Sequence, residues 1–165
     1  MPSDTLFSYL DENSGIMDVF FKDMKKYGPA LSLAQEVLRE PSSLSAKDRE
    51  IIAAYTSQLN QCKYCNTSHE AFARSLGATG EDSERISPLL TYVEKLTLSP
   101  SSISKEDYNS VIDAGFSEED LSDAIAVCAA FNFYNRIVEG HGIKPHEDYS
   151  ADIEMINTKG YDQRY

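Results

Sequence analysis

The residues best suited to chemistry lie in one short stretch, where two residues separate Cys62 from Cys65 and three residues separate Cys65 from His69. Residues three, four and seven apart share one face of an α-helix, so these side chains are expected along one stripe of a helix that begins near Cys62. Two thiols at this spacing can form a disulfide, and an imidazole one turn away can accept a thiol proton. The stretch therefore predicts thiol chemistry.

A carboxylate, Glu50, is expected to join this group because the chain folds back. Within one straight helix Glu50 would lie roughly 18 Å from Cys62, which is out of reach. The helical pattern breaks at residues 60–61, however, and this break allows the two flanking helices to pack antiparallel. In such a pair position i faces about position 120 − i, which puts Glu50 beside His69. The expected order in space is Glu50, His69, Cys65, Cys62, in which a carboxylate orients an imidazole that serves a thiol.

The position of the thiols also favours reactivity. Unpaired backbone N–H groups at a helix start stabilise a thiolate, and Lys63 adds a nearby cation, so we expect a lowered pKa for at least one of the two thiols. In a competing interpretation the two cysteines, His69 and Glu50 hold a zinc ion. Zinc knuckles usually place their cysteine pair in a turn with glycine, and this segment has none. Redox chemistry is therefore favoured, without a metal or other cofactor.

The composition narrows the class of protein. A chain of 165 residues with 41% hydrophobic residues suits one globular domain, residues 1–165. Its formal net charge of −12 excludes nucleic acids and anionic membranes as main partners. The start of the chain lacks the pattern of a secretory signal, and the longest apolar run, residues 124–131, is too short to span a bilayer. The cytoplasm is the expected compartment, where a CxxC pair is more often catalytic, redox-active or metal-binding than structural.

Helical periodicity predominates along the chain, and no strand-like alternation stands out. Helices are expected over residues 16–26, 30–39, 45–59, 62–75, 87–98, 104–114 and 118–139. The last of these is apolar nearly all round between Ile125 and Tyr134, so it is expected to be buried by the domain, by a second subunit or by both. The polar tail from about residue 141 is expected to be a loose terminus or a docking arm. The sequence thus predicts an all-α, single-domain bundle of about seven to eight helices.

The motif resembles a known family. The pattern of Glu50, Asn60, Cys62, Tyr64, Cys65 and His69 resembles the alkylhydroperoxidase D-like (AhpD-like) family, part of the carboxymuconolactone decarboxylase-like superfamily. Residues 129–136 are similar to the final core helix of that family, and the resemblance covers about residues 15–145. It implies a helical bundle of the AhpD-like type. It also implies a thiol peroxidase that reduces hydrogen peroxide or organic hydroperoxides.

The resemblance also implies roles for the residues. Cys65 would be the peroxidatic cysteine that becomes a sulfenic acid, and Cys62 the resolving cysteine that closes a disulfide with it. Glu50 and His69 would relay the proton of Cys65. A thiol reductant, such as a dihydrolipoyl protein, and assembly as a homodimer, trimer or hexamer are implied as well. Two alternatives stay open, namely a dithiol–disulfide oxidoreductase and a non-catalytic metal-binding protein that uses the same residues.

Overall fold

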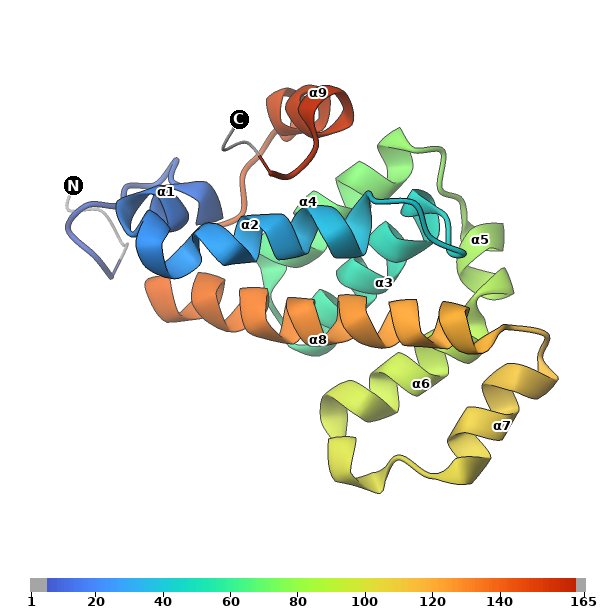
Figure 1. The fold of residues 1–165 in the computed structure, drawn as a ribbon. Helices are drawn as coiled ribbons and strands as arrows, with labels where there is room; N and C mark the ends of the chain where they lie inside the picture. The colour runs from blue at the N-terminus through green and yellow to red at the C-terminus, as the bar shows by residue number, and fades with distance from the viewer. Residues whose placement is uncertain (1–5, 163–165) are drawn as a thin grey trace.

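The computed structural model describes residues 6–162, and every regular element in this range is a helix (Figure 1). The elements are α1 (Ile16–Lys22), α2 (Met24–Leu38), α3 (Ala46–Leu59), α4 (Lys63–Ser75), α5 (Gly80–Arg85), α6 (Ser87–Leu98), the 3₁₀ helix η1 (Pro100–Ser102), α7 (Lys105–Asp113), α8 (Glu118–His141) and α9 (Ser150–Lys159). The all-α fold class is therefore confirmed. The sequence prediction had not included α5 and α9. None of the described helices is long and apolar enough to cross a membrane.

The centre of the molecule is the helix pair α3 and α4, which pack closely against each other. The long helix α8 lies against both, and α2 runs beside α8 in Figure 1. Residues of α8 such as Val127, Phe131 and Val138 are buried in the main core, while Ala129 and Phe133 remain exposed. The domain itself therefore buries most of the apolar helix, and one stripe of it stays accessible.

The break between α3 and α4 is held by hydrogen bonds to α8. Gln61 has a φ of 57°, in the left-handed region that non-glycine residues seldom adopt. The side-chain amide of Asn60 donates to the Oδ1 atoms of Asn132 and Asn135, at 3.0 Å in both cases. Asn135 in turn donates to Oγ of Ser57 at 2.9 Å. These bonds fix the chain reversal that sets the register between α3 and α4.

The break expected between the helices over residues 16–26 and 30–39 is wrong. The structure starts α2 at Met24 and runs it through Pro29, because Asp23 caps its start by accepting a hydrogen bond from the backbone N–H of Lys26 at 3.1 Å. Proline inside a helix removes one backbone hydrogen bond, but the buried face of α2 continues past it to Leu38. Burial of that face outweighs the local preference for a break.

The described part of the polar tail packs on its own chain. Its helix α9 contacts α4, and Phe72, Tyr149 and Ile156 form a second, smaller apolar cluster there. The hydroxyls of Thr67 and Tyr149 lie 3.0 Å apart across this contact. Figure 1 shows α9 on the side of the molecule away from α6 and α7. The segment after α9 thereby comes close to α2 and α3.

Candidate active site

The structure brings Glu50 and His69 into direct contact. Glu50 lies on α3 and is fully buried, and His69 lies on the facing turn of α4 and is 8% exposed. The Oε2 atom of Glu50 is 2.6 Å from Nδ1 of His69. The antiparallel pairing of α3 and α4 therefore produces the contact that the residue spacing indicated. The catalytic roles of both residues stay predictions.

Two residues that the sequence analysis did not single out complete the surroundings of Glu50. Its Oε1 atom accepts a hydrogen bond from the hydroxyl of Tyr161 at 2.6 Å and another from the guanidinium of Arg39. Arg39 is the C-cap of α2, and Tyr161 follows α9 in the tail. Tyr161 is separated from Glu50 by 111 positions, and no motif links the two. The sequence offered no signal for either residue.

These contacts decide the charge state of Glu50. Burial alone would raise the pKa of Glu50, but the adjacent His69, Arg39 and Tyr161 outweigh burial and hold it below its ordinary value. An ionised carboxylate accepts hydrogen bonds and donates none, so the Nδ1 atom of His69 is the donor in their contact. The Nε2 atom of His69 then carries the lone pair that can accept a proton.

The two cysteines of the pair are buried free thiols at the start of α4. Cys62 is the N-cap residue, and Cys65 lies in the first turn of the helix. The neighbouring thiol of Cys65 and burial raise the pKa of Cys62. At Cys62 these two effects outweigh the helix N-terminus. The expectation of a lowered pKa for at least one of the two thiols stays a prediction.

Cys65 and His69 line one small cavity of about 60 Å³. Its other walls are apolar and aromatic side chains of α1, α2 and α8, among them Ile16, Leu31 and Phe131. A second hollow of about 90 Å³ also touches His69 and opens toward α9. Space of this size holds a water molecule or a few heavy atoms of a small substrate. Both the thiol and the imidazole border this space, so a water molecule there can relay a proton between them.

The ring of His69 is held by aromatic neighbours. It meets the rings of Phe131 and Phe72 edge-on, with centroids 4.5 and 5.1 Å away. The ring of Tyr161 lies nearly parallel to it, at 6.2 Å and an angle of 17°. These contacts, together with the hydrogen bond to Glu50, fix the orientation of the imidazole relative to the cavity.

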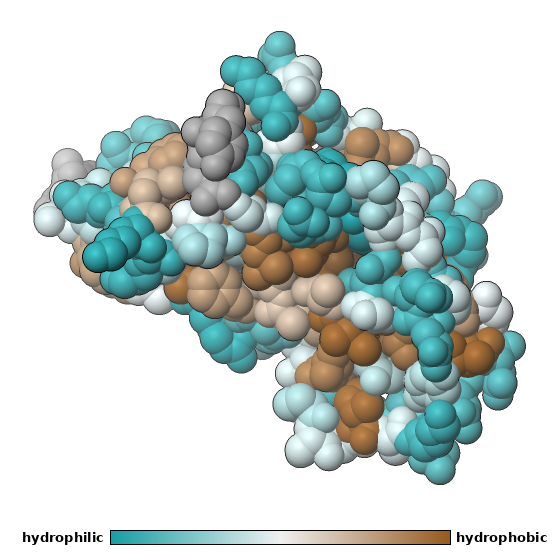
Figure 2. Space-filling view, in the orientation of Figure 1, coloured by the Kyte–Doolittle hydropathy of each residue, from teal (hydrophilic) through white to brown (hydrophobic). Residues whose placement is uncertain are grey.

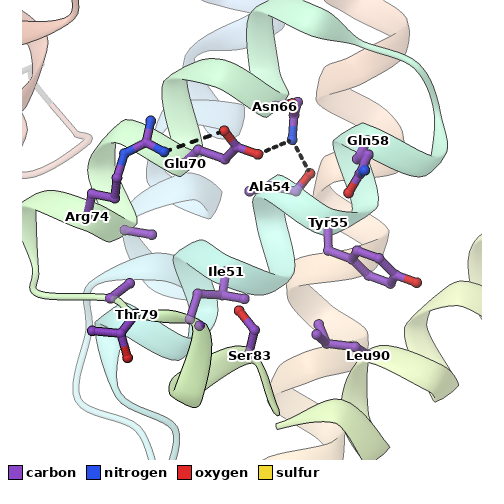
Figure 3. A pocket seen from close by; sticks show the side chains of 13 residues that line it. Ile51, Ala54, Tyr55, Gln58, Asn66, Glu70, Arg74, Thr79, Ser83 and Leu90 are labelled. Carbon is purple, nitrogen blue, oxygen red and sulfur yellow. Dashed lines mark hydrogen bonds and ion pairs between the residues drawn. The ribbon is translucent and has the colours of Figure 1, made fainter. Parts of the chain in front are cut away.

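A wider cavity of about 480 Å³ lies on a different side of the α3–α4 pair (Figure 3). Figure 3 shows Asn66 donating to the backbone oxygen of Ala54 and to Glu70, and Glu70 pairing with Arg74. Asn66 follows Cys65 and Glu70 follows His69 by one position. Their side chains therefore point to another side of the helix than the two site residues. Neither thiol lines this cavity, and the proposed chemistry belongs to the smaller one.

The zinc alternative finds no support in the arrangement of side chains. Across residues 6–162, no three side chains of histidine, cysteine, aspartate or glutamate are grouped so that they could hold a metal ion.

The third cysteine, Cys128, is buried on α8 and lies 3.2 Å from the hydroxyl of Thr97. Burial raises the pKa of Cys128, as expected for an inert thiol in a core.

Comparison with known proteins supports the resemblance noted in the sequence. Residues 29–87 match the carboxymuconolactone decarboxylase family, and this segment holds Glu50, both cysteines and His69. A curated relative, the uncharacterized protein YdfG of Bacillus subtilis (strain 168), is 25% identical over 132 residues, which span 72% of this chain and 90% of YdfG.

Two solved structures share the fold. One is an uncharacterized peroxidase-related protein from Silicibacter sp. TM1040, with a TM-score of 0.74 and 24% identity over 81% of this chain and 77% of that one. The other, from Ralstonia eutropha JMP134, is described as an alkylhydroperoxidase AhpD core and an uncharacterized peroxidase-related protein. Its TM-score is 0.73, with 21% identity over 80% of this chain and 76% of that one. The shared fold confirms the expected helical bundle of the AhpD-like type, and the match over residues 29–87 agrees with the resemblance in sequence.

Proposed function

We propose that this protein is a thiol-dependent peroxidase that reduces hydrogen peroxide or organic hydroperoxides, with Cys65 as the attacking residue. The observation that carries the proposal is the small cavity shared by Cys65 and His69, whose imidazole is held by an ionised Glu50. This is the arrangement that activates a nucleophile by general base catalysis. The names of the structural neighbours, which refer to peroxidases, agree with it.

In the first step Nε2 of His69 takes the proton of Cys65, directly or through a water. The thiolate attacks the terminal oxygen of the hydroperoxide, the O–O bond breaks, and Cys65 becomes a sulfenic acid. The leaving alkoxide, or hydroxide from hydrogen peroxide, takes the proton back from the imidazolium. Glu50 stabilises the imidazolium throughout and does not itself accept a proton, because Arg39 and Tyr161 compensate its charge.

In the second step the sulfur of Cys62 attacks the sulfenic sulfur of Cys65. A disulfide forms, and the hydroxide that leaves is protonated to water by the proton of Cys62. One peroxide is thus reduced and two thiols are oxidised in each cycle. A thiol reductant must then return the disulfide to two thiols, and a dihydrolipoyl group is the class that the family resemblance implies.

The proposal is tested by adding hydroperoxide to the reduced protein in the absence of reductant. We expect each chain to consume one equivalent of peroxide and to lose two thiols, with peptide mapping showing a Cys62–Cys65 disulfide and an unmodified Cys128. Turnover with dithiothreitol is then compared between cumene hydroperoxide and a model disulfide. Preference for the disulfide would instead assign a dithiol–disulfide oxidoreductase. Both sulfurs are buried, which favours a small peroxide over a bulky disulfide.

We propose that the chain self-associates through α2 and α8. Hydrophobic side chains gather between these helices in the view of Figure 2, and Leu33 and Phe133 are 43% and 42% exposed. Sedimentation velocity should show a dimer, trimer or hexamer, and Phe133→Asp should shift it to monomer, because a charge would be buried at the contact. Leu98→Asp, at an exposed apolar position on α6, is the control that should keep the assembly. A monomeric native protein would contradict this proposal.

A further inference from the structure

The segment after α9 places the side chain of Tyr161 beside Glu50 and His69. The hydroxyl of Tyr161 donates to Oε1 of Glu50, and its ring stacks on the ring of His69. The guanidinium of Arg39 lies 5.0 Å from the centroid of the same tyrosine ring. Tyr161 therefore contacts the carboxylate and two of the groups that surround it, His69 and Arg39. It also lines both small hollows beside His69.

The residues next to Tyr161 fix its position by contacts with α2. Gly160 has a φ of 77°, and a Cβ at this position would lie 2.4 Å from Oε1 of Gln35 on α2. This close approach lets the backbone N–H of Tyr161 donate to the same Gln35 oxygen at 2.8 Å. Beyond it, Asp162 accepts a hydrogen bond from the hydroxyl of Ser32 at 2.8 Å. Hydrogen bonds to α2 thus hold the segment on both sides of the tyrosine.

We propose that Tyr161 is a positioning residue that tunes the basicity of His69 through Glu50. The proposal rests on the proposed peroxidase function, in which His69 must both accept and return a proton. The hydroxyl draws negative charge toward Oε1, so Oε2 offers less charge to the imidazole, and the imidazolium is stabilised less. A base of moderate strength can take the proton of Cys65 and still release it to the leaving oxygen.

The hydroxyl of Tyr161 acts as a donor and does not carry a proton away. Burial and the adjacent charge of Glu50 raise the pKa of Tyr161 well above its usual value. Other titratable groups share the two hollows with His69, namely Cys65 and Tyr64 on α4, Tyr134 on α8, and Tyr149 and Asp152 at α9. A Tyr161→Phe substitution leaves all of them in place and keeps the aromatic ring, so it isolates the hydroxyl.

The experiment follows the titration of the His69 imidazole by proton NMR in the full chain. Cys65→Ser is used as the background in every sample, so that no thiolate couples to the ring. The chain has three histidines, and loss of one signal in His69→Gln identifies the resonance. Tyr161→Phe should raise the titration midpoint by about 0.5 to 1 pH unit. The matched control is Tyr55→Phe, which removes a tyrosine–glutamate hydrogen bond to Glu94 on α6 and should leave the midpoint unchanged.

A second variant guards against a local rearrangement in the first. Gly160→Ala forces a Cβ against Gln35 at a positive φ, so it should dislodge Tyr161 and move the midpoint in the same direction. A titration midpoint of His69 that is unchanged or lowered in both variants would overturn the proposal. A change in thermal stability alone would indicate a purely structural tyrosine and would also overturn it. The titration needs no peroxide turnover, so a shifted midpoint without activity would refute the peroxidase function and leave this inference standing.

Discussion

A Cys65→Ser variant is expected to lose peroxide turnover by about three orders of magnitude or more, because the loss of a nucleophile removes the reaction path itself. A serine hydroxyl is a far weaker acid than a thiol, and His69 cannot deprotonate it to a useful extent. The measurement is the rate of cumene hydroperoxide consumption with dithiothreitol as reductant. Retention of more than a tenth of the native rate would contradict the role assigned to Cys65.

The other two cysteines supply matched comparisons. Cys62→Ser should still react once with peroxide and leave a sulfenic acid at Cys65 that dimedone traps, but it should form no disulfide within the chain. Cys128→Ala should turn over at the native rate, since Cys128 lies apart from the cavity. Dimedone labelling at Cys62 in place of Cys65 would reverse the assignment.

The contact between Glu50 and His69 could be predicted because it depends on local rules. Helical spacing sets which side chains share a face, and one break in the pattern is enough to place two helices antiparallel. The structure adds the reason why the break is stable, namely the hydrogen bonds from Asn60 to Asn132 and Asn135 on α8. Those partners lie more than 70 positions away, so the sequence indicated the reversal without showing what holds it.

Arg39 and Tyr161 could not be predicted for a related reason. Each reaches Glu50 from a helix end, where one backbone angle decides the direction of the side chain. For Tyr161 that angle belongs to Gly160, and its effect depends on where Gln35 lies on another helix. The raised pKa of Cys62 could not be predicted for the same kind of reason. The helix N-terminus is visible in the sequence, while burial and the second sulfur are properties of the packed structure.

Glu50→Gln is expected to cost about 3 kcal/mol of stability at pH 7, because it leaves the guanidinium of Arg39 buried without a counter-charge. The side chains of Arg39 and Glu50 are 12% and 0% exposed, so water compensates little. One nitrogen of that guanidinium, Nη2, is already buried without a hydrogen-bond partner. Urea denaturation followed by circular dichroism measures the loss. Glu94→Gln, at an exposed carboxylate, is the control and should change stability by less than about 1 kcal/mol.

The same variant should change how stability depends on pH, and the sign follows from linkage. The pKa of Glu50 in the folded protein lies below its ordinary value of 4.5, so its ionised form stabilises the fold above that pH. This stabilisation by the ionised carboxylate is lost as the pH falls through the pKa that Glu50 has in the folded protein. The difference in the free energy of unfolding between wild type and Glu50→Gln should therefore be widest near neutrality and should narrow below about pH 4.5.

Adding Arg39→Met to Glu50→Gln should recover most of the lost stability, since it removes the unpaired charge of Arg39. A double variant as unstable as the single one would show that the cost comes from His69 and Tyr161 losing their acceptor, and not from the buried ion pair.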